Sequence, residues 1–133
     1  MSVRVVSPYQ LSPQTGQTPG MERLTAIDED IGSKNLWVGV VTLEPGARSG
    51  AHHHGDCESV ICVLSGRIRF RLGENLAETA EAGPGDFIFV PPNVVHMEIN
   101  LSDSEGIDTI VIRDSQENVV INVDMPESVL EEE

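Results

Sequence analysis

The chain has few basic residues and few cysteines, and each shortage excludes a class of function. Lysine and arginine number 8 against 22 aspartates and glutamates, a formal net charge of −14 at pH 7. A surface of that sign repels phosphate groups, so we expect no nucleic-acid partner and no membrane partner. Cys57 and Cys62 form no C-x-x-C motif, which excludes zinc-ribbon and thioredoxin-like sites. On one strand they would point to opposite faces, so a disulfide between them is geometrically poor.

Long apolar runs are also missing. No apolar stretch of the 133 residues approaches the roughly 20 residues that a membrane span needs. The N-terminus shows no hydrophobic segment followed by a small-residue cleavage site. We therefore expect a single domain in the reducing cytoplasm.

Turn residues divide the chain into three parts. Residues 1–35 are punctuated by proline and glycine and predict an irregular N-terminal arm packed on the domain. Within the arm, the segment 21–27 (MERLTAI) has apolar residues at helical spacing and predicts a helical turn or two. Residues 36–125 predict the main domain, and residues 126–133 an acidic C-terminal tail.

The main domain is predicted to be all-β. Short runs rich in β-branched and aromatic residues alternate with turn sequences, and no long helical pattern intervenes, which favours a sandwich or barrel. The predicted strands are LWVGVVTL, ESVICVL, RIRFRL, DFIFVP, VVHMEINL, DTIVIR and NVVINV.

Aromatic and basic residues in these strands allow further predictions. Trp37, Phe87 and Phe89 are candidates for the core or a cavity wall. Residues 67–72 (RIRFRL) place three apolar side chains on one face of a strand and three arginines on the other. A solvated or interface face is the favoured interpretation of the arginines, because burying three guanidiniums is costly. The wall of an anion-binding pocket is the alternative.

The four histidines are the main functional signal. Three are consecutive, His52 to His54, and the fourth is His96. On an extended segment His52 and His54 point to one face while His53 points away. Glu58 follows a short turn, and imidazoles with a carboxylate suit a divalent transition metal. The pattern predicts a metal site of His52, His54, Glu58 and His96. The alternative is a solvent-exposed histidine patch with one buried structural histidine.

Two segments that contain these residues resemble the signature motifs of the cupin superfamily. The first motif matches Gly46, His52, His54, Glu58 and the closing Gly66, and the second matches Gly85, Pro91, His96 and Asn100. The resemblance implies a cupin jelly-roll β-barrel (a double-stranded β-helix) with the metal inside. It also implies one divalent metal ion (Mn, Fe, Ni, Co or Zn) held by three histidines and a glutamate, and a homodimer.

The chain departs from the motifs at two positions. Asn93 stands where the second motif has a glycine, and asparagine tolerates the left-handed conformation that the turn requires. The gap from Glu58 to Gly66 is one residue longer than usual, so that Ser59 is in register. Either a bulge realigns Glu58, or the metal has only three histidine ligands. We expect Glu58 to be a ligand.

Two further residues are expected to line the pocket. Glu98 lies two residues beyond His96 and shares its face on a regular strand. There it can act as an acid or base or orient a metal-bound water, or it can simply bond to a neighbouring strand. Cys62 has the strand parity of Glu58 and is expected to face the same cavity. The sequence assigns no catalytic residue.

These observations predict a metal-dependent cupin enzyme acting on a small polar metabolite, with isomerase, dioxygenase and lyase chemistry all open. One alternative is a non-catalytic cupin that binds or senses a small molecule. Another is an enzyme like the methylthioxylulose phosphate methylsulfurylases of methionine salvage, because QTPGM, GARSGAHHHG, LSGRIRF and GPGDFIFVPP resemble small bacterial cupins of that appearance. That type carries a functional thiol, where this chain has Thr109.

Overall fold

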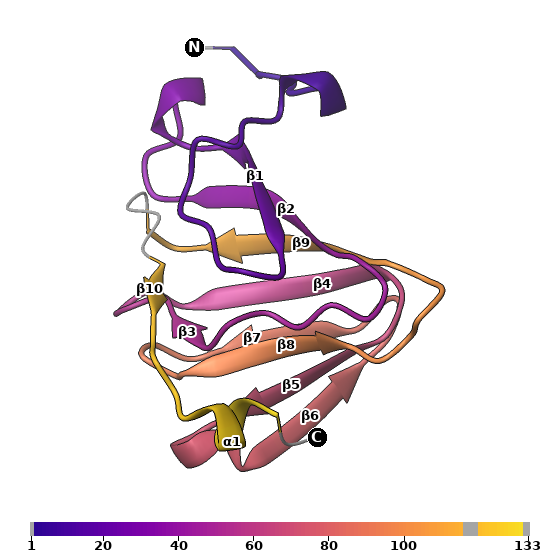
Figure 1. Ribbon diagram of the computed structural model, residues 1–133. Coiled ribbons are helices and arrows are strands. Elements are labelled where there is room, and N and C mark those ends of the chain that lie inside the picture. The colour runs from indigo at the N-terminus through magenta and orange to yellow at the C-terminus, as the bar shows by residue number, and fades with distance from the viewer. Residues whose placement is uncertain (1, 116–119, 132–133) are drawn as a thin grey trace.

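Two antiparallel five-stranded sheets form the molecule (Figure 1). The computed structural model describes residues 2–115 and 120–131. Sheet A has the strand order β1-β2-β9-β4-β7, and sheet B the order β10-β3-β8-β5-β6. The strands are β1 (Glu22–Ile27), β2 (Trp37–Leu43), β3 (His52–His53), β4 (Ser59–Ser65), β5 (Ile68–Leu72), β6 (Glu78–Ala82), β7 (Phe87–Val90), β8 (His96–Asn100), β9 (Ile107–Arg113) and β10 (Ile121–Asn122). The predicted all-β fold is confirmed.

Helical structure in the described residues is limited to single turns. Three 3₁₀ turns span Pro8–Gln10, Glu29–Ile31 and Glu74–Leu76, and one short helix, α1, spans Glu127–Leu130. Within the described part of the chain, no helix is long and apolar enough to cross a membrane. Part of the predicted strand NVVINV and the end of the acidic tail lie outside the described residues.

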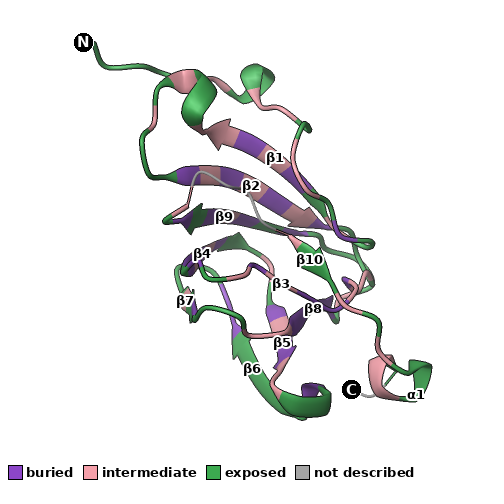
Figure 2. Ribbon diagram, turned by 90° about the vertical axis from the view of Figure 1, so that its left-hand side faces the viewer, coloured by how far each residue is buried: buried purple, intermediate pink, exposed green. Residues whose placement is uncertain are grey.

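The core lies between the sheets because side chains alternate along the strands. In β2 and β9 every second residue is buried, and Figure 2 shows this banding on both strands. The inward apolar residues form one cluster: Trp37, Val41, Leu43, Ile61, Val63, Ile68, Phe70, Ala82, Val90, Ile107 and Val111. Trp37 is only 1% exposed, as predicted for a core residue.

Strand β8 is buried along its whole length because both of its faces are covered. On its outer face, Met97 and Ile99 pack with apolar residues of the C-terminal segment. The Nη1 of Arg71 on β5 donates to the carbonyl oxygen of Val129 in α1 at 2.6 Å. The arginine face of β5 is therefore the outer face of sheet B, and Arg69 on that face is paired with Glu81 at 3.1 Å. This fits the favoured interpretation of the arginines as an interface face.

The helical prediction for residues 21–27 is wrong. Glu22–Ile27 form β1, which pairs antiparallel with β2 at the edge of sheet A. Arg23 and Thr25 are buried, so the inward face follows a period of two, and the helical spacing of Met21 and Leu24 is incidental. Backbone pairing with β2 outweighs the local pattern in this segment.

Phe87 and Phe89 are not core residues. They are 74% and 57% exposed, because the alternate residues of β7, Ile88 and Val90, point toward the core. Cys57 and Cys62 are both free, as their spacing predicted.

Trp37 and Gly39 form a tightly packed contact that can be tested. A Cβ at Gly39 would lie 2.3 Å from Cη2 of Trp37 and 2.6 Å from the Leu24 carbonyl oxygen. We expect Gly39→Ala to lower the free energy of unfolding by about 1–3 kcal/mol, because the indole cannot move away without strain. Gly50→Ala is the control, since its Cβ would meet Thr18 at an ordinary 3.6 Å. Urea denaturation of both variants measures the difference; equal stability would contradict the packing described.

Candidate metal centre

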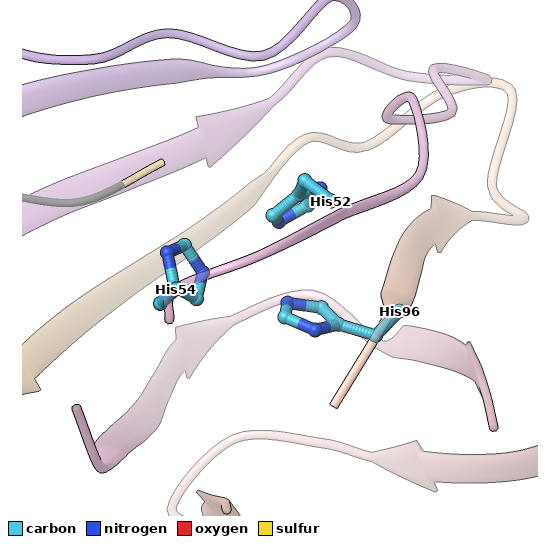
Figure 3. Close-up of side chains that lie close together, drawn as sticks. All are labelled: His52, His54 and His96. Atoms are coloured by element: carbon cyan, nitrogen blue, oxygen red, sulfur yellow. The ribbon is translucent and has the colours of Figure 1, made fainter. Parts of the chain in front are cut away.

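Two strands far apart in the sequence bring three histidines together inside the barrel. His52 of β3 lies directly opposite His96 of β8, and His54 follows β3 by one residue. The three rings face one another (Figure 3), and one ring nitrogen from each lies within 4.8 Å of the others. His52, His54 and His96 are 0%, 8% and 2% exposed, so this is not a solvent-exposed patch. His53 lies outside the cluster and accepts a hydrogen bond from the Gly55 N–H.

Backbone carbonyls fix how two of these rings are protonated. Nδ1 of His52 lies 2.9 Å from the Gly50 carbonyl oxygen, and Nδ1 of His96 lies 2.9 Å from that of Val94. Because a carbonyl oxygen only accepts hydrogen bonds, each Nδ1 carries the proton. In a neutral ring Nε2 then carries no proton and presents a lone pair. Neither Nε2 finds a hydrogen-bond partner among the described residues. Each unsatisfied buried acceptor costs about 1–3 kcal/mol, and coordination to a metal ion would remove that cost.

Glu98 completes the cluster from β8. Its Oε2 lies 3.3 Å from Nε2 of His52 and likewise has no hydrogen-bond partner among the described residues. A carboxylate oxygen and an imidazole lone pair repel at this distance unless a proton or a cation lies between them. A proton there would leave a charged imidazolium at His52, a fully buried position. A metal ion bound to both atoms would satisfy them while His52 stays neutral.

The protonation states around Glu98 suit a metal site. Burial alone would raise the pKa of Glu98, but the neighbouring His52, His96 and Arg23 outweigh burial and lower it. Burial lowers the pKa of His96 to about 4 despite the charge of Glu98. At neutral pH the site therefore offers an ionised carboxylate and a neutral imidazole, the forms that bind metals.

The turns of the two motif segments have the backbone conformations that their residues favour. Asn93 has a φ of 62°, so the left-handed turn survives without glycine, as expected. Its side-chain amide donates to the Asp56 carboxylate at 2.9 Å. Gly66 has a φ of +84°, and a Cβ there would lie 2.7 Å from the Gly106 carbonyl oxygen. Both turns are therefore fixed by local chemistry.

Residues 39–112 match the cupin domain family. The chain is a cupin. It superposes on a polyketide cyclase, RemF, from Streptomyces resistomycificus with a TM-score of 0.73 at 23% identity, covering 98% of this chain and 92% of that chain. A conserved protein with a double-stranded β-helix domain from Klebsiella pneumoniae gives a TM-score of 0.71 at 16% identity, covering 93% and 100%. These likenesses show the fold and confirm the predicted jelly-roll barrel.

A longer relative matches over part of its length. Oxalate decarboxylase from Bacillus subtilis superposes with a TM-score of 0.70 at 22% identity, covering 86% of this chain and 32% of that chain. No curated protein sequence matches the chain.

Glu58 is not part of the cluster in this cupin. Its side chain is exposed, and its backbone N–H donates to the Asp114 carboxylate at 2.9 Å. Strand β4 begins at Ser59, which is 2% exposed and points inward, so the preceding residue points outward. The irregularity in β4 lies between Val63 and Ser65 and does not realign Glu58. The extra residue before Gly66 therefore displaces the carboxylate, and the expectation of Glu58 as a ligand is corrected.

Cys62 does not line the cavity either. It shares strand parity with Glu58, as inferred, but residues of that parity point outward. Cys62 is therefore half-buried on the outer face of β4. The buried thiol is that of Cys57, which donates to the His54 carbonyl oxygen at 3.0 Å. Thr109 is buried and donates to the Val41 carbonyl oxygen at 2.9 Å, so this inward position holds a hydroxyl and no thiol.

A small cavity beside the cluster contains residues that the sequence interpretation missed. It measures about 10 Å³, the room that one water needs. Its polar lining comprises Arg23, His54, Ser59, Glu98 and Arg113. The inward position of Arg113 could have been predicted, because it has the same strand parity as Thr109 and Val111. The inward position of Arg23 could not, because its segment was interpreted as helical.

The positions of the two cysteines predict different reactivities. Cys62 should react with a thiol-specific disulfide reagent at pH 8 in a fast phase, because it is only half-buried. Cys57 should react slowly, because it is 7% exposed and burial raises the pKa of its thiol. We expect Cys62→Ser to abolish the fast phase and Cys57→Ser to preserve it. Unfolded protein, with both thiols accessible, is the control. A fast phase that survives in Cys62→Ser would contradict the outward placement.

Proposed function

We propose that this cupin binds one divalent transition-metal ion through His52, His54 and His96 and acts on a small polar metabolite there. One observation carries the proposal: Nε2 of His52, Nε2 of His96 and Oε2 of Glu98 are all buried without hydrogen-bond partners among the described residues, in one cluster. Buried polar atoms are otherwise almost always satisfied. Three buried acceptor atoms without hydrogen-bond partners in one cluster are the arrangement expected of metal ligands.

Glu98 is the proposed carboxylate donor. It supplies from β8 the charge that the motif resemblance expected from Glu58 on the other side of the barrel. Three nitrogens and one carboxylate oxygen suit Mn, Fe, Co, Ni or Zn. When bound, such an ion polarises substrate oxygens as a Lewis acid.

The residues around the ligands have supporting roles in this proposal. The Gly50 and Val94 carbonyls hold the His52 and His96 rings in the tautomer that presents Nε2 inward. Ser49 holds the β8 backbone at Glu98: its hydroxyl accepts from the Glu98 N–H at 2.8 Å, and its own N–H donates to the Glu98 carbonyl at 2.8 Å. Two structural relatives are named as a polyketide cyclase and an oxalate decarboxylase, which supports a catalytic role over a purely sensory one.

Metal content tests the proposal. Protein purified without an affinity tag should hold one metal ion per chain by elemental analysis. His96→Ala should lose the ion, because one of three converging nitrogens is removed, whereas Glu58→Gln should retain it. Metal added at about a hundred times its Kd should stabilise the wild type by about 2.7 kcal/mol and leave His96→Ala unchanged.

Two results would contradict the proposal. A full equivalent of metal in His96→Ala would place the ion elsewhere. Loss of metal in Glu58→Gln would restore that carboxylate as the ligand. Metal-loaded protein screened for turnover with and without O₂ then separates catalysis from sensing, since a sensor binds its ligand without converting it.

A further inference from the structure

The outer face of sheet A carries apolar side chains where a solvated face would be polar. In β2, β4 and β9 alternate residues are buried, and the residues between them point outward. An antiparallel sheet with one face in water normally has polar side chains at such outward positions. In sheet A most of these positions hold valine, isoleucine, leucine or phenylalanine.

The strand register aligns these side chains in two rows across the sheet. In the first row, Val38 of β2 lies opposite Ile112 of β9. Ile112 in turn lies opposite Val60 of β4, which lies opposite Phe89 of β7. The second row runs in the same way across all five strands. Together the two rows form a surface of nine uncharged residues, the sheet A face: Leu24, Val38, Val40, Val60, Cys62, Phe87, Phe89, Ile110 and Ile112.

The sheet A face belongs to neither apolar core cluster in the described part of the chain. Phe87, Phe89 and Ile112 are 74%, 57% and 37% exposed, and the other residues of the face are half-buried. The outer face of sheet B differs, because the C-terminal segment packs on it and buries Met97 and Ile99. The chain therefore covers one of its outer sheet faces and leaves an apolar one in contact with water.

The area of this side of sheet A suits a stable interface. Five strands about 4.8 Å apart and about 20 Å long give roughly 24 by 20 Å, or roughly 500 Å² in projection. The two apolar rows fill the greater part of it, and the next row, with Glu22, Thr42 and Asp108, gives a polar rim. Two such surfaces in contact cover roughly 1,000 Å², the area that a specific protein interface needs.

The chemistry of the sheet A face favours a second copy of this chain as its partner. A basic partner attracted by the net charge of −14 would need charges at the contact positions, and the two rows carry none. A twisted apolar sheet packs best on another sheet of the same twist, with the two about 10 Å apart. The same face of a second copy supplies that sheet, and a twofold axis closes the assembly at two chains.

We propose that two copies of this chain associate through their sheet A faces in a twofold-symmetric dimer. Strand β9 is the middle strand of sheet A, so a twofold axis through the centre of the interface brings β9 onto its own copy. Ile110 and Ile112 of β9 then lie at the centre of the contact. The inference does not depend on the proposed metal site, because the histidines lie inside the barrel and the sheet A face lies on its outside.

Sedimentation equilibrium of the wild-type protein tests the proposal. The protein should sediment with twice the mass of one chain and dissociate on dilution. Both copies carry a charge of −14 and meet through uncharged residues. Raising NaCl from about 0.05 M to about 0.5 M should therefore tighten the dimer, because salt screens the repulsion between the copies. A monomer at all concentrations, or a dimer that salt weakens, would overturn the inference.

Two variants locate the interface. Ile112→Glu should weaken the dimer about a hundredfold or more, because the twofold axis brings the two new carboxylates together. Phe89→Glu on β7 should weaken it as well. Ile121→Glu is the matched control, since Ile121 is 43% exposed on β10 of sheet B and lies outside the sheet A face. Circular dichroism checks that each variant is folded. An unchanged dimer in folded Ile112→Glu and Phe89→Glu would place the interface elsewhere and overturn the inference.

Cys62 reports on the interface without any substitution. It lies between Ile110 and Phe87 in the second row, so dimerisation buries its thiol. The fast phase expected of this thiol is that of the monomer. At a fixed excess of reagent, its rate should fall about tenfold or more as the protein concentration rises through the range of dimerisation. If neither variant folds, this measurement decides: a rate independent of concentration in protein that sediments as a dimer would overturn the inference.

Discussion

The antiparallel pairing of β3 with β8 is the constraint on which the site depends. It places His52 opposite His96, although more than forty residues separate them in the chain. His54 follows from β3 and Glu98 from β8, so one short pairing brings all four side chains together. Each of the two paired histidines then uses the carbonyl two residues before it to fix its ring. The geometry of the cluster is thus built into the backbone, and few other side chains are needed to hold it.

Although the chain is strongly acidic, the barrel interior holds more basic than acidic side chains among the described residues. Acidic residues lie mostly outside, where water solvates them, and Glu98 is the only acid among the described buried residues. Arg23 and Arg113 lie inside, stabilised by neutral acceptors and by the Trp37 ring. Burying these charges costs stability, and natural folds keep such a cost mainly where function requires it.

Much of the fold and part of the site could be predicted from the sequence. Alternating strands and turn residues give the all-β barrel, and the spacing of His52 and His54 gives their shared face. Glu58 could not be placed with certainty, because one extra residue reverses which side chain points inward. Arg23 was missed because its segment has apolar residues at helical spacing, and only pairing with β2 makes it a strand. Long-range pairing, which local pattern does not encode, decided both cases.

The most direct test of the central claim is anomalous X-ray diffraction from crystals of the metal-loaded protein, recorded at the absorption edge of the bound metal. The account predicts one anomalous peak per chain, bonded to His52, His54 and His96, with the Glu98 carboxylate as the nearest acidic group and Glu58 pointing to solvent. A peak bonded to Glu58, or a fully loaded protein with no peak among the three histidines, would contradict it.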